Sequence, residues 1–143
     1  MLKARITNEL ILDETIDTNI LVGASTYQNI SFDKLTKKLS LLNAQINRRL
    51  FRYYLKYPDR RIVFYCNHER VENNTHSHII IKIPPMYDKV KVMFLMKELW
   101  KKLDDRDQPK FKLYVDFNVK NEFANVRYAF KRFNQDTFVV IYK

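Results

Sequence analysis

The chain has 143 residues and a formal net charge of +10, with 46% hydrophobic and 14% aromatic residues. This length and composition fit one folded domain spanning 1–143 and exclude a disordered tail. A single cysteine excludes a disulfide framework. No apolar run reaches the roughly 18 residues of a membrane span, and no secretory signal is recognised, so we expect an intracellular protein without membrane contact. The positive charge, interleaved with aromatic residues, favours nucleic acid as partner.

The spacing of apolar residues predicts strands and helices in a definite order. In chain order these are strand 19–27, helix 31–56, strand 60–69, strand 76–83, helix 87–103, strand 110–119, helix 121–133 and strand 137–142. Ser31 is the expected cap of the long helix, and the second and third strands should form a hairpin. The order β-α-β-β-α-β, then α and β, predicts an α+β fold. We expect a ferredoxin-like or RRM-like split βαβ arrangement with a central antiparallel sheet of about five strands.

Two of the three histidines, His76 and His78, open the strand 76–83. Alternate residues of a strand point the same way, so both imidazoles should share the less covered face of the sheet. The residues between them and after them should face the helices instead: Ser77, Ile79, Ile81 and Ile83. Two imidazoles on one strand face suit a metal ion. A hydrogen-bonded or solvated pair is the alternative without metal.

A third ligand is available across the hairpin, where His68 and Glu69 end the preceding strand. Strand alternation alone cannot choose between them, because consecutive residues point to opposite faces. Three protein ligands leave open coordination positions, which a catalytic metal needs.

The short helix 121–133 carries a candidate nucleophile. Tyr128 falls nearly opposite its apolar stripe, and Lys131 lies one turn further on. A phenol can attack phosphorus, and a neighbouring cation favours its reactive anionic form. An exposed tyrosine beside a solvated lysine is the alternative. The same Tyr-x-x-Lys spacing occurs at Tyr53 and Lys56, where the tyrosine is expected in the core stripe of the long helix.

Together these residues resemble the HUH-family replication initiator (Rep) endonucleases of rolling-circle plasmids and viruses. "CNHERVENNTHSHIIIKIP" resembles their metal-binding hairpin, in which His68 takes the position of the third ligand. "VRYAFKRF" resembles their tyrosine helix, here near the C-terminus. The likeness covers roughly residues 18–142. The chain departs from the family at Ser77, usually a hydrophobic residue, and in "GASTY", which only approximates the first motif. No ATPase motif follows, so we expect no helicase domain in this chain.

The resemblance implies a sequence-specific single-stranded DNA endonuclease and strand transferase that initiates rolling-circle replication. The histidine pair with His68, or with Glu69 in its place, would hold Mg²⁺ or Mn²⁺. Tyr128, assisted by Lys131, would attack a DNA phosphodiester and leave a 5′-phosphotyrosyl link and a free 3′-OH. The partners implied are single-stranded or hairpin origin DNA and host replication machinery, in a prokaryotic cytoplasm or a eukaryotic nucleus. The residues expected to contact DNA are Lys82, Arg127 and Arg132.

Other functions stay open. An HUH transposase would also place its tyrosine helix after the histidines, whereas a relaxase would use an early tyrosine, for which Tyr27 is the candidate. A non-catalytic, RRM-like nucleic-acid-binding module needs the sheet and the charge but no metal. Cys66 beside His68 could act as a nucleophile, although a small core thiol is the ordinary interpretation.

Overall fold

The computed structural model describes residues 17–26, 31–71, 74–104, 111–116 and 138–141. Side chains are described for 31–68, 77–103 and 139–141. Within these ranges, no helix is long and apolar enough to cross a membrane. The predicted helix 121–133 lies outside the described residues.

Strands and helices follow one another along the chain in the predicted order. They are β1 (Asp17–Thr26), α2 (Phe32–Leu50), the 3₁₀ turn η1 (Pro58–Arg60), β2 (Val63–Val71), β3 (Asn74–Ile83), α3 (Lys89–Asp104), β4 (Phe111–Asp116) and β5 (Phe138–Ile141). The strands form one sheet in the order β4-β1-β3-β2-β5, and each neighbouring pair is antiparallel. The predicted α+β class with an antiparallel sheet is confirmed.

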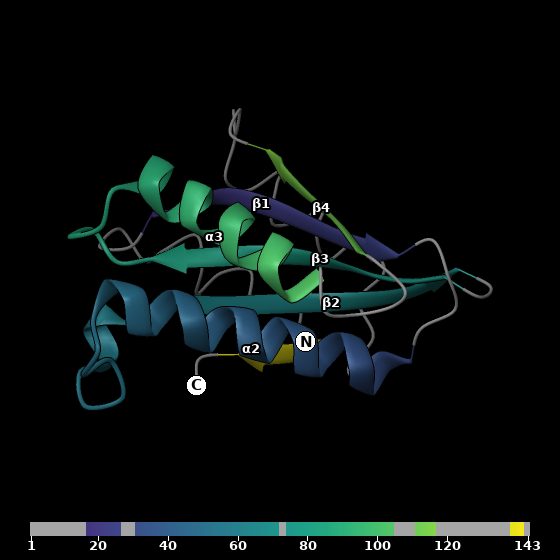
Figure 1. The fold of residues 1–143 in the computed structure, drawn as a ribbon, viewed down its shortest axis with the longest axis horizontal. Coiled ribbons are helices and arrows are strands. Elements are labelled where there is room, and N and C mark those ends of the chain that lie inside the picture. Colours follow the sequence, from purple (N-terminus) through teal and green to yellow (C-terminus); the bar gives the residue numbers. More distant parts are fainter. Residues whose placement is uncertain (1–16, 27–30, 72–73, 105–110, 117–137, 142–143) are drawn as a thin grey trace, which may run out of the picture.

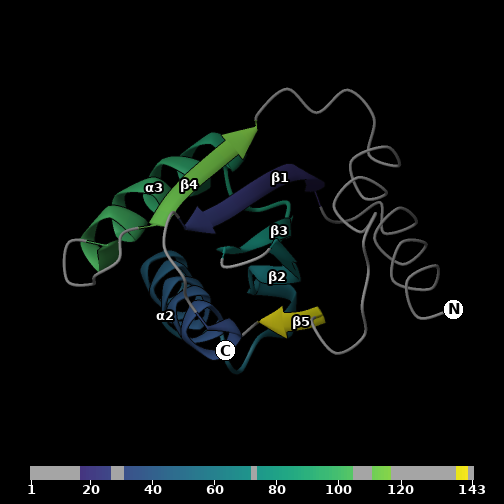
Figure 2. The same cartoon turned by 90° about the vertical axis from the view of Figure 1, so that its right-hand side faces the viewer.

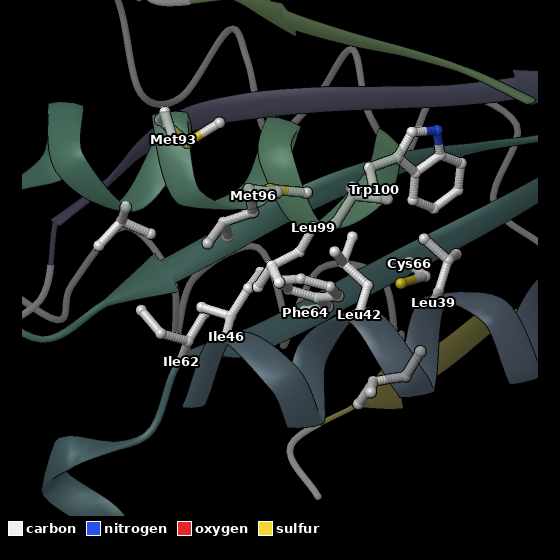
Figure 3. Packing of buried hydrophobic residues seen from close by; sticks show 14 of the residues in the cluster. Leu39, Leu42, Ile46, Ile62, Phe64, Cys66, Met93, Met96, Leu99 and Trp100 are labelled. Atoms are coloured by element: carbon white, nitrogen blue, oxygen red, sulfur yellow. The ribbon is translucent and has the colours of Figure 1, made fainter. Parts of the chain in front are cut away.

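Both helices cover the same face of the sheet, and the hydrophobic core fills the space between the two layers (Figures 1 and 2). From β3, the alternate residues Ile79, Ile81 and Ile83 point into this core and are fully buried, as strand alternation predicts. Burying one such side chain contributes about 1.5–3 kcal/mol relative to leaving it in water. Figure 3 shows the helix side chains that meet the sheet, among them Leu39, Leu42, Ile46, Met93, Met96, Leu99 and Trp100.

The long helix begins where the sequence predicts and ends earlier. The hydroxyl of Ser31 accepts a hydrogen bond from the Lys34 N–H at 3.1 Å, which caps the first turn. The helix was expected to run to residue 56, but it ends at Leu50, and Phe51 has extended backbone angles of φ −159° and ψ 107°. The predicted range is therefore wrong at its C-terminal end.

Two buried asparagines of α2 explain this early end. Oδ1 of Asn47 accepts from the Ile62 N–H at 2.8 Å, and Nδ2 of Asn47 donates to the Ile62 carbonyl at 3.1 Å. Asn43 donates to the same carbonyl at 3.1 Å. We call these hydrogen bonds the asparagine clamp. Because the clamp holds Ile62, the residue before β2, beside the end of α2, the chain must leave the helix and turn back. Tyr53 consequently lies outside the helix and is 48% exposed. The expectation that Tyr53 belongs to the core stripe of the long helix is therefore wrong.

We expect Asn47→Ala to lower the free energy of unfolding by about 2–3 kcal/mol, because the buried N–H of Ile62 loses its acceptor. Urea denaturation measures this change. Lys37→Ala, at an exposed position of the same helix, is the control and should change stability by less than about 0.5 kcal/mol. An Asn47→Ala effect as small as the control would contradict the role of the clamp.

Candidate functional site

The register of β3 against its neighbours decides which candidate ligands share a face. His76 lies directly opposite Glu69 of β2, and His78 lies opposite Asn67. On its other side, His78 lies opposite Gly23 of β1. Directly opposed residues of antiparallel strands share a face, and so do alternate residues of one strand. These five positions, which we call the histidine patch, therefore lie together on the sheet face away from α2 and α3.

Gly23 is the one member of the histidine patch without a side chain. It is the only glycine of the chain and sits beside His78, with Tyr114 of β4 as its next neighbour in the row. A glycine inside a strand weakens the strand, and it commonly marks a close approach of ligand or backbone.

The patch is partly sheltered from water. The histidines were expected on the less covered face, yet Asn67 is fully buried and so is Ile80, the next residue of β3 on that face. His78 itself is only partly exposed. Tyr65, His78 and Lys82 on this face are nevertheless partly exposed, whereas Ser77 and Ile79 on the other face are buried, so the histidine face is the less covered one, as expected. Electrostatic interactions are stronger at a site partly shielded from water than on an open surface.

His68 lies on the opposite face, between the sheet and the first turns of α2. Its side chain is 2% exposed. Nε2 is 3.0 Å from Oγ1 of Thr36, and Nδ1 is 2.9 Å from Oγ of Ser77. The ring of Phe32 packs edge-on at 4.7 Å between centroids. Both ring nitrogens are thus used in hydrogen bonds that join α2 to the hairpin.

The directions of these hydrogen bonds follow from Thr36. Its hydroxyl donates to the carbonyl of Phe32 at 2.9 Å. Because a hydroxyl has one hydrogen, Oγ1 must then accept from His68, so Nε2 carries the proton. Nδ1 accepts from the hydroxyl of Ser77. A neutral imidazole in this single tautomer satisfies every member of the network, which explains the serine between the two predicted ligands.

The protonation of the buried groups agrees with this network. Burial lowers the pKa of His68 to about 4, so the ring is neutral near pH 7. Burial also raises the pKa of the Cys66 thiol, although a hydrogen bond with Ser77 acts in the opposite direction. The thiolate is the nucleophilic form of cysteine, so the structure supports the interpretation of Cys66 as a core thiol.

The structure corrects the order of preference for the third ligand. His68 was placed first, but it pairs with Ser77 on the helix-covered face and cannot join His78. Glu69, the alternative, holds the position opposite His76. Among the residues whose side chains are described, no three His, Cys, Asp or Glu groups lie close enough to hold a metal. Neither residue 69 nor residue 76 belongs to that set.

The remaining candidates are distributed as follows. Lys82 lies on the same face of β3 as His78, about 13 Å further along the strand, and is partly exposed. Tyr53 and Lys56 follow α2, whose last turns are hydrogen-bonded to Ile62 just before β2 begins. The patch lies toward the other end of β2, at Asn67 and Glu69, so that pair is not brought to it. Four predicted residues lie outside the described part of the chain: Arg127, Tyr128, Lys131 and Arg132.

Sequence reasoning missed the partners of His68 and the position of Gly23 beside His78. For the hairpin a signal was available, because two-residue loops are the commonest hairpin connections. A register counted outward from such a connection agrees with the observed pairs, in which His68 lies opposite Ser77 and Glu69 opposite His76. Thr36 gave no such signal, because its contact depends on how α2 packs on the sheet.

Comparison of the chain with protein-family models, curated proteins and solved structures finds no match.

We expect the stability of the protein to fall as the pH drops from about 6.5 to about 4. In this window the unfolded chain binds a proton at His68 and the folded chain does not, so proton uptake favours unfolding. The lowered pKa corresponds to a loss of up to about 3 kcal/mol at the acid end. Denaturant unfolding of wild type and His68→Gln at about pH 7 and about pH 4.5 separates this effect from that of the carboxylates. Equal pH dependence in the two proteins would contradict the neutral, buried His68.

Proposed function

We propose that this chain is a metal-dependent single-stranded DNA endonuclease and strand transferase of the HUH replication-initiator kind. The observation that carries the proposal is the histidine patch, where His76 and His78 lie on one face and Glu69 stands opposite His76. A carboxylate suits Mg²⁺ and Mn²⁺, and imidazoles bind divalent transition metals, so this donor set fits such an ion. The patch lies on the sheet face away from α2 and α3, where His78 is partly exposed.

The fold supports the same proposal. The chain order β1-α2-β2-β3-α3-β4 and the strand order β4-β1-β3-β2 support a ferredoxin-like split βαβ arrangement, to which β5 would be an addition beside β2. The resemblance to HUH initiators rests on the same order of strands and helices around the His-x-His strand. Many functions share the fold, so it supports the proposal less strongly than the patch does.

In the proposed reaction, the phenol of Tyr128 attacks the phosphorus of a DNA phosphodiester. The Oη–P bond forms as the P–O3′ bond breaks, and the proton of the phenol ends on the 3′-oxygen. Lys131 favours the phenolate before attack. A divalent cation held by His76, His78 and Glu69 would offset the charge that develops on the phosphoryl oxygens. The products are a 5′-phosphotyrosyl protein and a 3′-OH that primes synthesis.

Basic residues supply the remaining contacts with the substrate. Lys82 shares the sheet face of the patch, and we propose that it contacts the phosphate backbone together with Arg127 and Arg132. Single-stranded or hairpin origin DNA is the proposed substrate, and host replication proteins would extend the 3′-OH, in a prokaryotic cytoplasm or a eukaryotic nucleus. An HUH transposase or relaxase would use the same chemistry on another DNA site.

A non-catalytic, RRM-like binding module is the second candidate. The observation that favours it is the sheet itself, whose face away from α2 and α3 carries the partly exposed Tyr65 next to Ile80. Such a module would bind nucleic acid through this face without a metal.

The covalent step is tested with an origin oligonucleotide and Mn²⁺ on a denaturing gel. We expect wild type to form a protein–DNA adduct, because the phosphotyrosyl bond survives denaturation. Tyr128→Phe should form none, whereas Tyr53→Phe, at the other Tyr-x-x-Lys position, should form as much as wild type. An undiminished adduct in Tyr128→Phe would contradict the proposed nucleophile.

The ligand set is tested by calorimetry with Mn²⁺ at neutral pH. Glu69→Gln and His78→Ala should each weaken Mn²⁺ binding by at least about tenfold, because each removes a ligand of the ion. His68→Gln should bind Mn²⁺ as wild type does, since His68 lies on the other face. Loss of Mn²⁺ binding in His68→Gln, together with unchanged Mn²⁺ binding in Glu69→Gln, would identify His68 as the third ligand instead. Absence of a site-specific signal in wild type would favour the RRM-like module.

A further inference from the structure

A basic hollow lies in the helix layer, on the other side of the sheet from the histidine patch. It has a volume of about 340 Å³ and lies between α2 and α3, which pack side by side (Figure 1). Leu99 and Leu103, both nearly buried, form an apolar lining. The polar lining is Gln45, Arg48, Arg49 and Lys102. Three cationic side chains from two helices thus converge on one concave surface.

The cations of this hollow are exposed to solvent. Within the described part of the chain, no carboxylate pairs with Arg48 or Arg49, and both are exposed. Lys102 contacts Glu98 at 3.4 Å, but both side chains are 57% exposed, and such a pair contributes little. Basic residues in the last turn of a helix interact favourably with its carbonyl end, which explains their presence on each helix separately. This interaction does not explain why basic residues of both helices line the same hollow.

Aromatic rings stand immediately after the arginines of α2. Arg52 lies over the ring of Tyr53 at 4.9 Å, and Tyr53 meets the ring of Phe51 edge-on at 6.0 Å. Phe51 in turn contacts Tyr57 at 5.6 Å, and Arg60 lies over Phe51 at 4.5 Å. We call these five residues the aromatic cluster. Tyr53 and Tyr57 remain about half exposed, at 48% and 49%. An arginine lies over one face of each of these rings, at 4.9 Å for Tyr53 and 5.9 Å for Tyr57, and the exposed remainder of each ring is offered to an unpaired base.

We propose that the basic hollow and the aromatic cluster form a second binding site, for single-stranded nucleic acid. Arg48, Arg49 and Lys102 hold the phosphate backbone, and unpaired bases stack on Tyr53 and Tyr57. Charge complementarity with a chain of net charge +10 selects a polyanion. The exposed rings select a single strand over a duplex, in which the base faces are covered. The site lies across the sheet from the histidine patch, and the inference does not depend on nicking.

The test measures binding of a fluorescent oligo(dT) of about 16 nucleotides by anisotropy. The protein is the full chain carrying Tyr128→Phe, in EDTA, so neither metal nor cleavage contributes and a failed nicking proposal does not affect the result. We expect Arg48→Gln with Arg49→Gln to weaken binding roughly tenfold. The double variant should also reduce the slope of log K against log salt by about 1.4, because each neutralised phosphate contributes about 0.7 to that slope. Lys37→Gln with Lys91→Gln is the control, because it removes the same charge from exposed positions outside the hollow.

Tyr53→Ala separates stacking from charge. It should weaken binding of oligo(dT) by about fivefold or more and leave binding of an abasic oligonucleotide of equal length unchanged. Equal losses in the arginine and lysine double variants would show a general charge effect and overturn the proposal. The same variants are measured with a duplex of equal length. A loss of binding seen only with the duplex, or with neither DNA, would overturn the proposal as well. Circular dichroism of each variant checks that these exposed substitutions leave the fold intact.

Discussion

The pairing of β2 with β3 is the constraint on which the rest of the structure depends. Once His68 lies opposite Ser77, strand alternation places Glu69 and both residues of the His-x-His pair on the other face. A shift of one residue would move every side chain of the strand to the opposite face. The same register therefore buries the isoleucines of β3 under the helices and keeps the candidate ligands away from them.

The network around His68 strengthens this constraint. A buried imidazole with an unsatisfied nitrogen would be costly, but here Thr36 and Ser77 satisfy both nitrogens, and Phe32 packs against the ring. Because the contacts come from α2 and β3, only the observed register and helix position satisfy them together. A histidine that resembles a catalytic ligand in sequence thus has a structural role, and the two sheet faces have separate roles.

The sequence predicted much of the fold because hydrophobic periodicity reports which residues are buried. The strands and helices, the Ser31 cap and the burial of Ile79, Ile81 and Ile83 follow from local patterns alone. The end of α2 did not, because Asn43 and Asn47 act through hydrogen bonds to Ile62, far along the chain. For the same reason, the buried role of His68 required the packing of α2. Tyr128 and Lys131 lie outside the described residues and stay predictions.

The separation of the two faces can be measured directly by NMR of the three imidazole rings. Nitrogen shifts distinguish the tautomers of histidine and respond when a nitrogen binds a diamagnetic ion such as Zn²⁺. We expect His68 to show the neutral Nε2–H tautomer with and without Zn²⁺, while the ring nitrogens of His76 and His78 shift as the ion binds. A change in the nitrogen chemical shifts of His68 on adding Zn²⁺ would contradict the assignment of structural and chemical roles to opposite faces of the sheet. A proton on Nδ1 of His68 would contradict it as well.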